Sequence, residues 1–143
     1  MSQHSASAPQ AGEVKPEIKA FFERFYAISD TPDDHEKYAD MFTENAKLIM
    51  ASNAVEGRDA IIQMRYGMWE KVAKRSHVPQ QLYPFGSGSD DIMLYGTVDY
   101  ELKDGKSANV EWAARAHFTN AEGDLKMDFY QVYLDTAAMS RAK

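Results

Sequence analysis

The sequence contains no cysteine, which excludes disulfide bonds, thiol nucleophiles and cysteine-ligated zinc. Positive charge is also scarce, because 16 lysines and arginines face 22 acidic residues, for a net charge of −6. Binding to a nucleic acid backbone needs clustered cations, so a nucleic acid partner is not expected. No apolar run approaches the ~18 residues of a membrane span, and no apolar stretch follows Met1 as in a secretory signal. These absences predict a cytoplasmic protein without a membrane partner.

The 143-residue chain does contain 44% hydrophobic and 12% aromatic residues, enough for one compact domain. Residues 1–15 hold few large apolar side chains, so they predict a disordered tail. Residues 136–143 predict a second tail at the C-terminal end. The folded domain is therefore expected over residues 16–135.

The apolar residues change their spacing halfway along this domain. Pro16 and Glu17 favour a helix start, and helical spacing follows. Further helices are expected from Thr31 to about Asn45 and over 58–74, with a strand at 46–52 between them. From Ser76 onward the apolar residues alternate, which predicts strands at about 77–85, 92–102, 108–119 and 125–134. Helices followed by an antiparallel sheet define an α+β class.

Two turn sequences predict how the last three strands pair. Asp104-Gly105 is typical of a two-residue hairpin, which pairs Thr97 with Trp112. Glu122-Gly123, interpreted in the same way, pairs Phe118 with Met127. The resulting inner face, which turns towards the helices, holds Met93, Tyr95, Thr97, Trp112, Ala114, Ala116, Phe118, Met127, Phe129, Gln131 and Tyr133. A homodimer is expected through the outer face, which would otherwise expose Ile92, Leu94, Val98, Val132 and Leu134.

The last strand leaves an alternative open, because its apolar phase changes along its length. A β-bulge near 129–131 would point Tyr130 inward in place of Gln131. A three-residue loop 121–123 is disfavoured, because it would place Lys126 and Asp128 opposite apolar residues.

Several segments carry a resemblance to a known family. They are FFERFY (21–26), YADMF (38–42), VEGRDAI (55–61), WAARAHF (112–118) and YQVYLD (130–135). With this order of elements, residues 16–135 resemble SnoaL-like proteins of the nuclear transport factor 2-like superfamily, in a subgroup common among fungal proteins. The resemblance implies a cone-shaped fold, in which a strongly curved sheet wraps around helices and encloses an apolar cavity. Relatives include polyketide cyclases, dehydratases, epoxide hydrolases and ketosteroid isomerases, and also proteins without catalysis.

His77 is the leading catalytic candidate. Its position resembles that of a histidine in scytalone dehydratase relatives, whose aspartate position on the first helix corresponds here to Ile28, with no second matching histidine. An imidazole can move a proton near neutral pH. The alternative interpretation is a histidine hydrogen-bonded at the mouth of a strand.

Polar tips on the predicted inner face complete the candidate site. Tyr95 and Gln131 are expected to hold an oxyanion, although they could instead bond each other or a buried water. The residues expected to line the cavity, or else to form plain core, are Phe22, Tyr26, Met64, Met68, Trp112, Tyr130 and Tyr133. His117 and Asp128 predict a cross-strand salt pair on the outer face.

These observations support three hypotheses about function. The first is a cofactor-free isomerase, cyclase or dehydratase that acts on a hydrophobic, polyketide- or terpenoid-like metabolite. The second is a non-catalytic carrier of a small apolar ligand, and the third is a protein adaptor. No cofactor and no metal ion are expected, because the acidic cluster at 33–36 fits the first turn of a helix.

Overall fold

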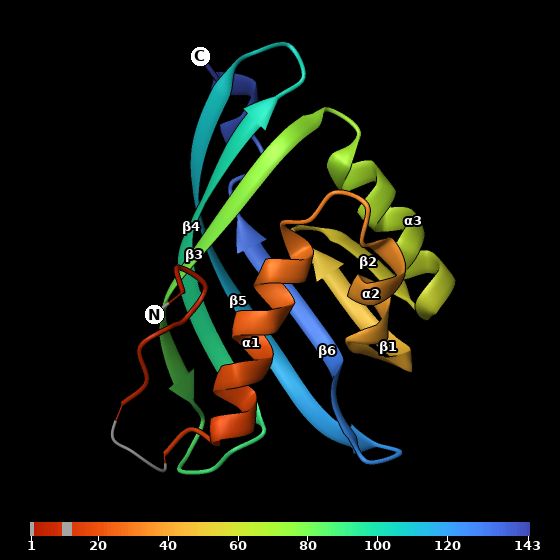
Figure 1. The fold of residues 1–143 in the computed structure, drawn as a ribbon, viewed down its shortest axis with the longest axis vertical. Helices are drawn as coiled ribbons and strands as arrows, with labels where there is room; N and C mark the ends of the chain where they lie inside the picture. The colour runs from red at the N-terminus through yellow and green to blue at the C-terminus, as the bar shows by residue number, and fades with distance from the viewer. Residues whose placement is uncertain (1, 10–12) are drawn as a thin grey trace.

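The computed structural model describes residues 2–9 and 13–143, and its helices precede most of its strands. The elements are α1 (Pro16–Ser29), α2 (His35–Asp40), β1 (Phe42–Met50), β2 (Asn53–Glu56), α3 (Arg58–Trp69), β3 (Val72–Pro84), β4 (Asp91–Leu102), β5 (Ser107–Ala121), β6 (Asp124–Leu134) and the short 3₁₀ helix η1 (Ala138–Arg141). The strands form one sheet in the order β2-β1-β6-β5-β4-β3. The class is α+β, as predicted, and α1 lies across the curved sheet (Figure 1).

The sheet is mixed, because β1 and β6 run parallel while the other neighbouring strands are antiparallel. The predicted second helix ends earlier than expected, since Phe42 already pairs with Met127 of β6. The third helix also ends early, because Val72 pairs with Leu102 of β4. At both places the backbone N–H and C=O groups form hydrogen bonds in the sheet in place of the helical hydrogen bonds of a longer helix.

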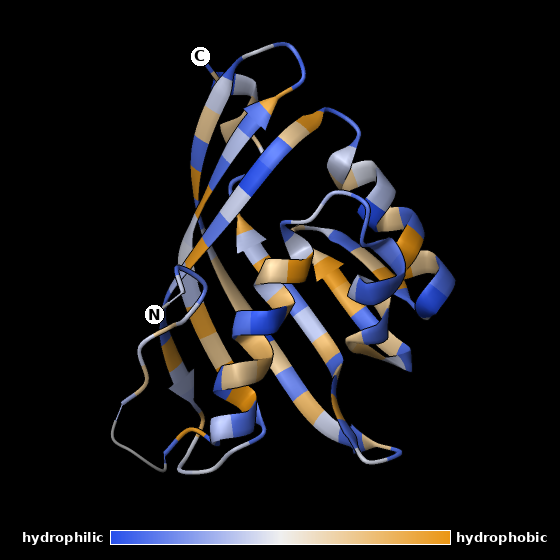
Figure 2. Ribbon diagram, viewed as in Figure 1, coloured by the Kyte–Doolittle hydropathy of each residue, from blue (hydrophilic) through white to orange (hydrophobic). Residues whose placement is uncertain are grey.

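Packing of α1 on the sheet forms the solid part of the core. Pro16 occupies the first turn of α1, and the buried side of the helix carries Phe21 and Phe22. The Phe118 ring of β5 lies nearly perpendicular to both, with centroids 5.0 Å and 5.2 Å away. Apolar stretches along α1 and the strands behind it are visible in Figure 2. These edge-to-face contacts hold α1 in a defined position on the sheet.

The β4–β5 hairpin has a three-residue loop in place of the predicted two-residue turn. The Leu102 N–H donates to the Lys106 carbonyl at 2.8 Å, and Gly105 has a φ of 89°. One left-handed residue at the end of the loop is typical of three-residue hairpins. The register therefore differs from the prediction by one residue, and Gly96 pairs with Trp112.

This register exchanges the two faces of β4. The side chains that the prediction placed outside, Ile92, Leu94 and Val98, are buried. Tyr95 and Met93, predicted inside, are exposed on the outer face. The aliphatic dimer surface predicted from the sequence is therefore wrong, because most of its members, including Val132, form the core of the single chain.

The β5–β6 hairpin keeps its predicted turn, and its strand contains the β-bulge that remained open. Glu122 and Gly123 both have positive φ, and Phe118 pairs with Met127. The register then shifts, so that His117 pairs with Phe129 and Ala116 with Tyr130. As a result, Tyr130 is buried on the inner face. Phe129, Gln131 and Tyr133, which were predicted on the inner face, lie on the outer face.

Gly96 marks a close approach between β3 and β4. A Cβ atom added there would lie 2.4 Å from the Val78 carbonyl oxygen and 2.8 Å from Pro79 Cα. The register between the two strands shifts beside this point, between Pro79 and Gln81. A residue without a side chain is therefore needed where the sheet is irregular.

Both predicted tails pack on the sheet where the structure describes them. Ser7 exchanges backbone hydrogen bonds with β3, donating to the Gln80 carbonyl at 2.8 Å and accepting from Leu82 at 2.9 Å. Residues 1 and 10–12 of the predicted N-terminal tail lie outside the described residues. At the other end, Ser107 and Lys143 exchange two backbone hydrogen bonds. Among the described residues, no helix is long and apolar enough to cross a membrane.

Candidate functional site

A cavity of about 250 Å³ lies beyond the C-terminal end of α1, between that helix, the end of α3 and the inner face of the sheet. Phe25, Val98, Trp112 and Val132 give it apolar walls. The polar side chains in its lining are Ser29, Tyr38, Asn53, Arg75, His77, Tyr100, Tyr130 and Thr136. Thr136 comes from the predicted C-terminal tail, which therefore forms part of the wall.

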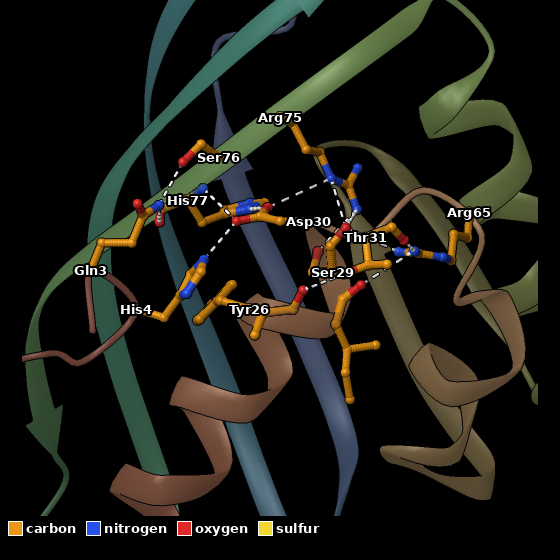
Figure 3. A network of polar contacts seen from close by, with 12 residues as sticks. Gln3, His4, Tyr26, Ser29, Asp30, Thr31, Arg65, Arg75, Ser76 and His77 are labelled. Atoms are coloured by element: carbon orange, nitrogen blue, oxygen red, sulfur yellow. Dashed lines mark hydrogen bonds and ion pairs between the residues drawn. The ribbon is translucent and has the colours of Figure 1, made fainter. Parts of the chain in front are cut away.

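His77 and Asp30 form the central polar contact of this site. Asp30 follows directly after α1, and His77 projects from β3. The His77 Nδ1 atom lies 2.5 Å from one Asp30 carboxylate oxygen, and the backbone N–H of His77 donates to the other at 2.8 Å. Asp30 therefore holds both the ring and the backbone of His77, as Figure 3 shows.

The environment sets the charge states of this pair. Burial lowers the pKa of the His77 imidazole, although its hydrogen bond and ion pair with Asp30 act in the opposite direction. Burial by itself raises the pKa of the Asp30 carboxyl, but interactions with His77 and His4 outweigh it, so the pKa lies below its ordinary value. An ionised Asp30 accepts the Nδ1 proton of a neutral His77. The lone pair of His77 then lies on Nε2, which has no hydrogen bond to any residue that the structure describes.

A second histidine reaches the same carboxylate from the N-terminal segment. His4 Nε2 lies 2.8 Å from the second Asp30 oxygen. Its neighbour Gln3 donates to Ser76 Oγ at 2.5 Å and to the His77 carbonyl at 3.1 Å. Residues 2–9 therefore hold Asp30 from the side opposite Arg75 (Figure 3).

Two buried arginines fix the end of α1. Arg75 donates from Nε and Nη2 to the Ser29 carbonyl, at 3.0 Å and 2.7 Å, and its Nε lies 4.0 Å from Asp30. Arg65 donates to the carbonyls of Ile28 and Thr31 at 3.4 Å and 2.6 Å. Cations are favourable at a helix C-terminus, where carbonyls lack helical partners. Burial lowers the pKa of Arg65 to about 10, so its guanidinium is still charged at neutral pH.

Aromatic side chains surround the imidazole. The Tyr26 ring centroid lies 5.1 Å from that of His77 and 5.1 Å from that of Trp112. The Tyr26 and Tyr130 hydroxyls are 2.7 Å apart, and burial raises the pKa of both phenols. The indole N–H of Trp112 is buried without a hydrogen-bond partner among the described residues, although the ring lines the cavity.

The structure brings together only part of the predicted site. His77, Met68, Trp112 and Tyr130 line the cavity, and Tyr26 lies directly behind His77. The remaining predicted residues lie elsewhere: Phe22 is buried against Phe118, Met64 packs on the core, and Tyr95, Gln131 and Tyr133 lie on the outer face.

Besides the phenols of Tyr38 and Tyr100 in the cavity lining, the sequence analysis missed three residues that bind or flank His77. Asp30 had no predicted role, and the resemblance pointed to Ile28, two residues earlier in the chain, as the aspartate position of the first helix. His4 was assigned to the tail, and Arg75 had no predicted role. The sequence contained one indication of the Asp30–His77 pair. An acidic residue lies directly after a predicted helix, and a histidine lies 47 positions later in a predicted strand. The predicted outer-face pair is present, with His117 Nδ1 2.7 Å from Asp128.

The fold is that of nuclear transport factor 2-like proteins, as comparison with solved structures shows. One similar structure is an NTF2-like protein of unknown function from Exiguobacterium sp. 255-15 (TM-score 0.68, 16% identity, covering 81% of this chain and 98% of that one). ActVI-ORFA from Streptomyces coelicolor has a TM-score of 0.69 at 18% identity, covering 83% and 95%. The hexachlorocyclohexane dehydrochlorinase LinA-type3 from Novosphingobium barchaimii LL02 has a TM-score of 0.68 at 11% identity, covering 82% and 84%.

At these identities the comparisons establish the fold alone. No known family profile matches the chain, and no curated protein matches it. The resemblance to the SnoaL-like group and its fungal subgroup therefore stays a prediction.

The geometry defines what the site can do chemically. A neutral imidazole with its Nε2 lone pair available is suited to accept a proton from a bound molecule. The phenols of Tyr38 and Tyr100 and the Arg75 guanidinium, which share the lining with His77, are donors for an oxygen that gains negative charge. Among the described residues, no group of three or more His, Asp or Glu side chains is arranged to hold a metal ion.

Proposed function

We propose that the chain is a cofactor-independent lyase or isomerase, within a SnoaL-like type of activity, that acts on a compact hydrophobic substrate by proton abstraction. The observation that carries this proposal is the Asp30–His77 pair, which orients Nδ1 towards the carboxylate at 2.5 Å. This arrangement leaves Nε2 as the basic atom of a residue that lines the cavity. Solved structures of similar fold include a dehydrochlorinase, which is a different protein at 11% identity.

In the proposed step, His77 Nε2 takes a proton from a carbon atom of the substrate next to a carbonyl group. The C–H bond breaks, an N–H bond forms on Nε2, and the electron pair moves to the carbonyl oxygen to give an enolate. Phenol and guanidinium donors of the cavity stabilise the enolate oxygen. Return of the proton to another carbon atom completes an isomerisation, and departure of a protonated leaving group completes an elimination.

Hydrogen exchange tests the proton abstraction without knowledge of the natural substrate. The probe is 2-tetralone in D₂O, followed by NMR, because enolisation replaces its α-hydrogens with deuterium. The wild-type chain should accelerate exchange, and His77→Gln should lower the catalysed rate by about 10²–10⁴-fold while keeping a near wild-type melting temperature. His117→Gln, on the outer face, serves as the matched control. Equal exchange by wild type and His77→Gln would refute the proposal.

The carrier and adaptor hypotheses predict different results. A carrier would bind an apolar ligand without exchanging its protons, and would lose that ligand on Trp112→Ala. An adaptor would neither exchange protons nor bind a small molecule. The walls of the cavity favour a small-molecule ligand over an adaptor role, since they are mostly apolar with a few convergent polar groups.

We also propose that two copies of the chain pair through the outer face of the sheet. This face exposes Tyr83, Met93, Tyr95 and Tyr133, which lie 50%, 42%, 41% and 43% exposed. Large apolar side chains that cluster on one surface often mark an interface. Light scattering should give twice the 16.2 kDa mass of one chain. Tyr95→Glu should give the single mass, whereas Tyr66→Glu, at an exposed tyrosine of α3, should leave the assembly unchanged.

A further inference from the structure

The cavity wall carries one permanent cation and no carboxylate. Arg75 is 5% exposed and lines the cavity, whereas no Asp or Glu is among the lining residues in the described part of the chain. The chain as a whole, by contrast, has a net charge of −6. A buried charge without a full counter-charge is costly, so the content of the cavity has to be considered together with Arg75.

Asp30 does not neutralise Arg75 by itself. Its nearest approach to Arg75 is 4.0 Å, while its two oxygens accept from His77 and His4 at 2.5 Å and 2.8 Å. Arg65 adds a second buried cation behind the same helix end, and it forms no ion pair with a carboxylate of the described residues. Around the end of α1, two buried guanidinium groups therefore share Asp30, which already accepts from two histidines, and only Arg65 is also influenced by the charge of Asp34 in the described part of the chain.

Arg75 also keeps a donor free. Its Nε and Nη2 atoms donate to Ser29, whereas Nη1 has no hydrogen bond among the residues that the structure describes.

Trp112 supplies a second free donor in the cavity, independent of Arg75. Trp112 is 5% exposed, and its indole Nε1 has no hydrogen-bond partner among the described residues. Both side chains line the cavity, and each has one N–H-bearing nitrogen, Nη1 of Arg75 and Nε1 of Trp112, without an acceptor among the described residues.

We propose that the cavity binds a compact, mostly apolar carboxylic acid, whose carboxylate accepts from Arg75 and Trp112. This inference rests on the proposed function, because it names the class of molecule that would be presented to His77. A neutral carbonyl oxygen can accept from the free N–H of Arg75, but it leaves the buried guanidinium charge without a counter-charge, so a permanent anion is favoured over a neutral molecule. The volume of about 250 Å³ limits the acid to a small ring system.

Calorimetric titration with two isosteric probes tests the proposal. The probes are 2-naphthoate and 2-naphthamide at pH 7, where the acid is ionised and the amide is neutral. The wild-type chain should bind the acid about tenfold more tightly or better, as expected for a charge-assisted hydrogen bond. Arg75→Met should abolish this preference, whereas Arg58→Met, which removes a cation outside the cavity, should preserve it. Equal binding of the two probes by wild type, or failure of 2-naphthoate to bind at millimolar concentration, would overturn the proposal.

Two further variants protect the test against misfolding of Arg75→Met. Arg75→Lys keeps the charge and should retain part of the preference. Trp112→Phe keeps the ring shape but removes the N–H, and should weaken 2-naphthoate more than 2-naphthamide. If Arg75→Met does not fold, an unchanged acid-to-amide ratio in Trp112→Phe would overturn the proposal.

Titration of His77→Gln separates this proposal from the proposed function. The variant should still prefer 2-naphthoate, because the two donors are intact. Loss of proton exchange with the preference unchanged is the expected result. A wild-type chain that prefers the acid but exchanges no protons would refute the base role of His77 alone, whereas exchange without acid preference would refute the anion site alone.

Discussion

The two halves of the space beneath α1 differ in what fills them. Near the start of the helix, Phe21, Phe22 and Phe118 are almost fully buried and pack edge to face. Past its end, the same sheet leaves a cavity whose wall contains Arg75 and His77. The aromatic half supplies apolar burial without polar groups, so the other half can contain charged groups that add little to stability. Substitutions in the two halves should therefore affect different properties.

The largest expected effect on stability lies in the aromatic half. Phe118→Ala removes a ring that two phenylalanines contact, and the free energy of unfolding should fall by about 3–5 kcal/mol. Urea denaturation followed by circular dichroism measures this change. Phe129→Ala, on the outer face of the neighbouring strand, is the matched control and should lose clearly less. Similar losses in both variants would contradict the solid packing beneath α1.

A smaller loss is expected where β3 and β4 approach closely. Gly96→Ala places a methyl group 2.4 Å from the Val78 carbonyl, which forces the strands apart. The expected cost is about 1–3 kcal/mol of unfolding free energy, and urea denaturation measures it. Gly67→Ala in α3, where an added Cβ meets no other atom, should leave stability unchanged or raise it slightly. A neutral Gly96→Ala would show that the strands can separate freely at this point.

The half that contains His77 should make the free energy of unfolding depend on pH. Since burial holds the pKa of His77 below the ordinary value of about 6.5, the unfolded chain binds a proton at a higher pH than the folded chain. Stability from this group is therefore complete above about pH 6.5 and falls as the pH drops towards the folded pKa, by at most about 1.4 kcal/mol per pH unit. Urea denaturation between pH 7 and pH 5 should give a flatter profile for His77→Gln. Identical profiles would argue against a buried neutral imidazole.

The smallest effect is expected at the outer-face pair. His117 and Asp128 are 40% and 39% exposed at their side chains, so solvent screens their interaction. His117→Ala should change the unfolding free energy by less than about 1 kcal/mol and leave exchange of 2-tetralone unaffected. Thermal denaturation and the NMR exchange assay measure the two quantities. A loss comparable to that of Phe118→Ala would mean that this pair has a role that its exposure does not indicate.

The sequence predicts those parts of the fold that depend on local patterns. The start of α1 follows from Pro16, and the β5–β6 turn follows from Glu122-Gly123, where both residues adopt positive φ. Asp104-Gly105 is compatible with loops of two or three residues, and only the second leaves a single left-handed residue. Large apolar side chains occupy both parities of β4, so periodicity alone did not identify its buried face.

The sequence could predict only those site residues that are recognisable one at a time, without knowledge of a long-range contact. His77 was identified because its position resembles that of a histidine in scytalone dehydratase relatives. Asp30 and Arg75 become part of the site through the contact between α1 and β3, which lie more than forty residues apart in the sequence. No local pattern encodes that contact. His4 was missed for the same reason, since its partner Asp30 lies 26 positions away.

The contact of His4 with Asp30 has a practical consequence for work on this chain. The N-terminal segment, which also places Ala6 in the core, reaches the carboxylate that orients the imidazole. Trimming the chain to begin at α1, a natural choice for recombinant expression, would remove one of the two hydrogen-bond donors on the second carboxylate oxygen, together with the buried Ala6 and Val14. A bulky purification tag fused ahead of Ser2 would lie close to the same contact, so binding and exchange measurements are best done with tags at other sites.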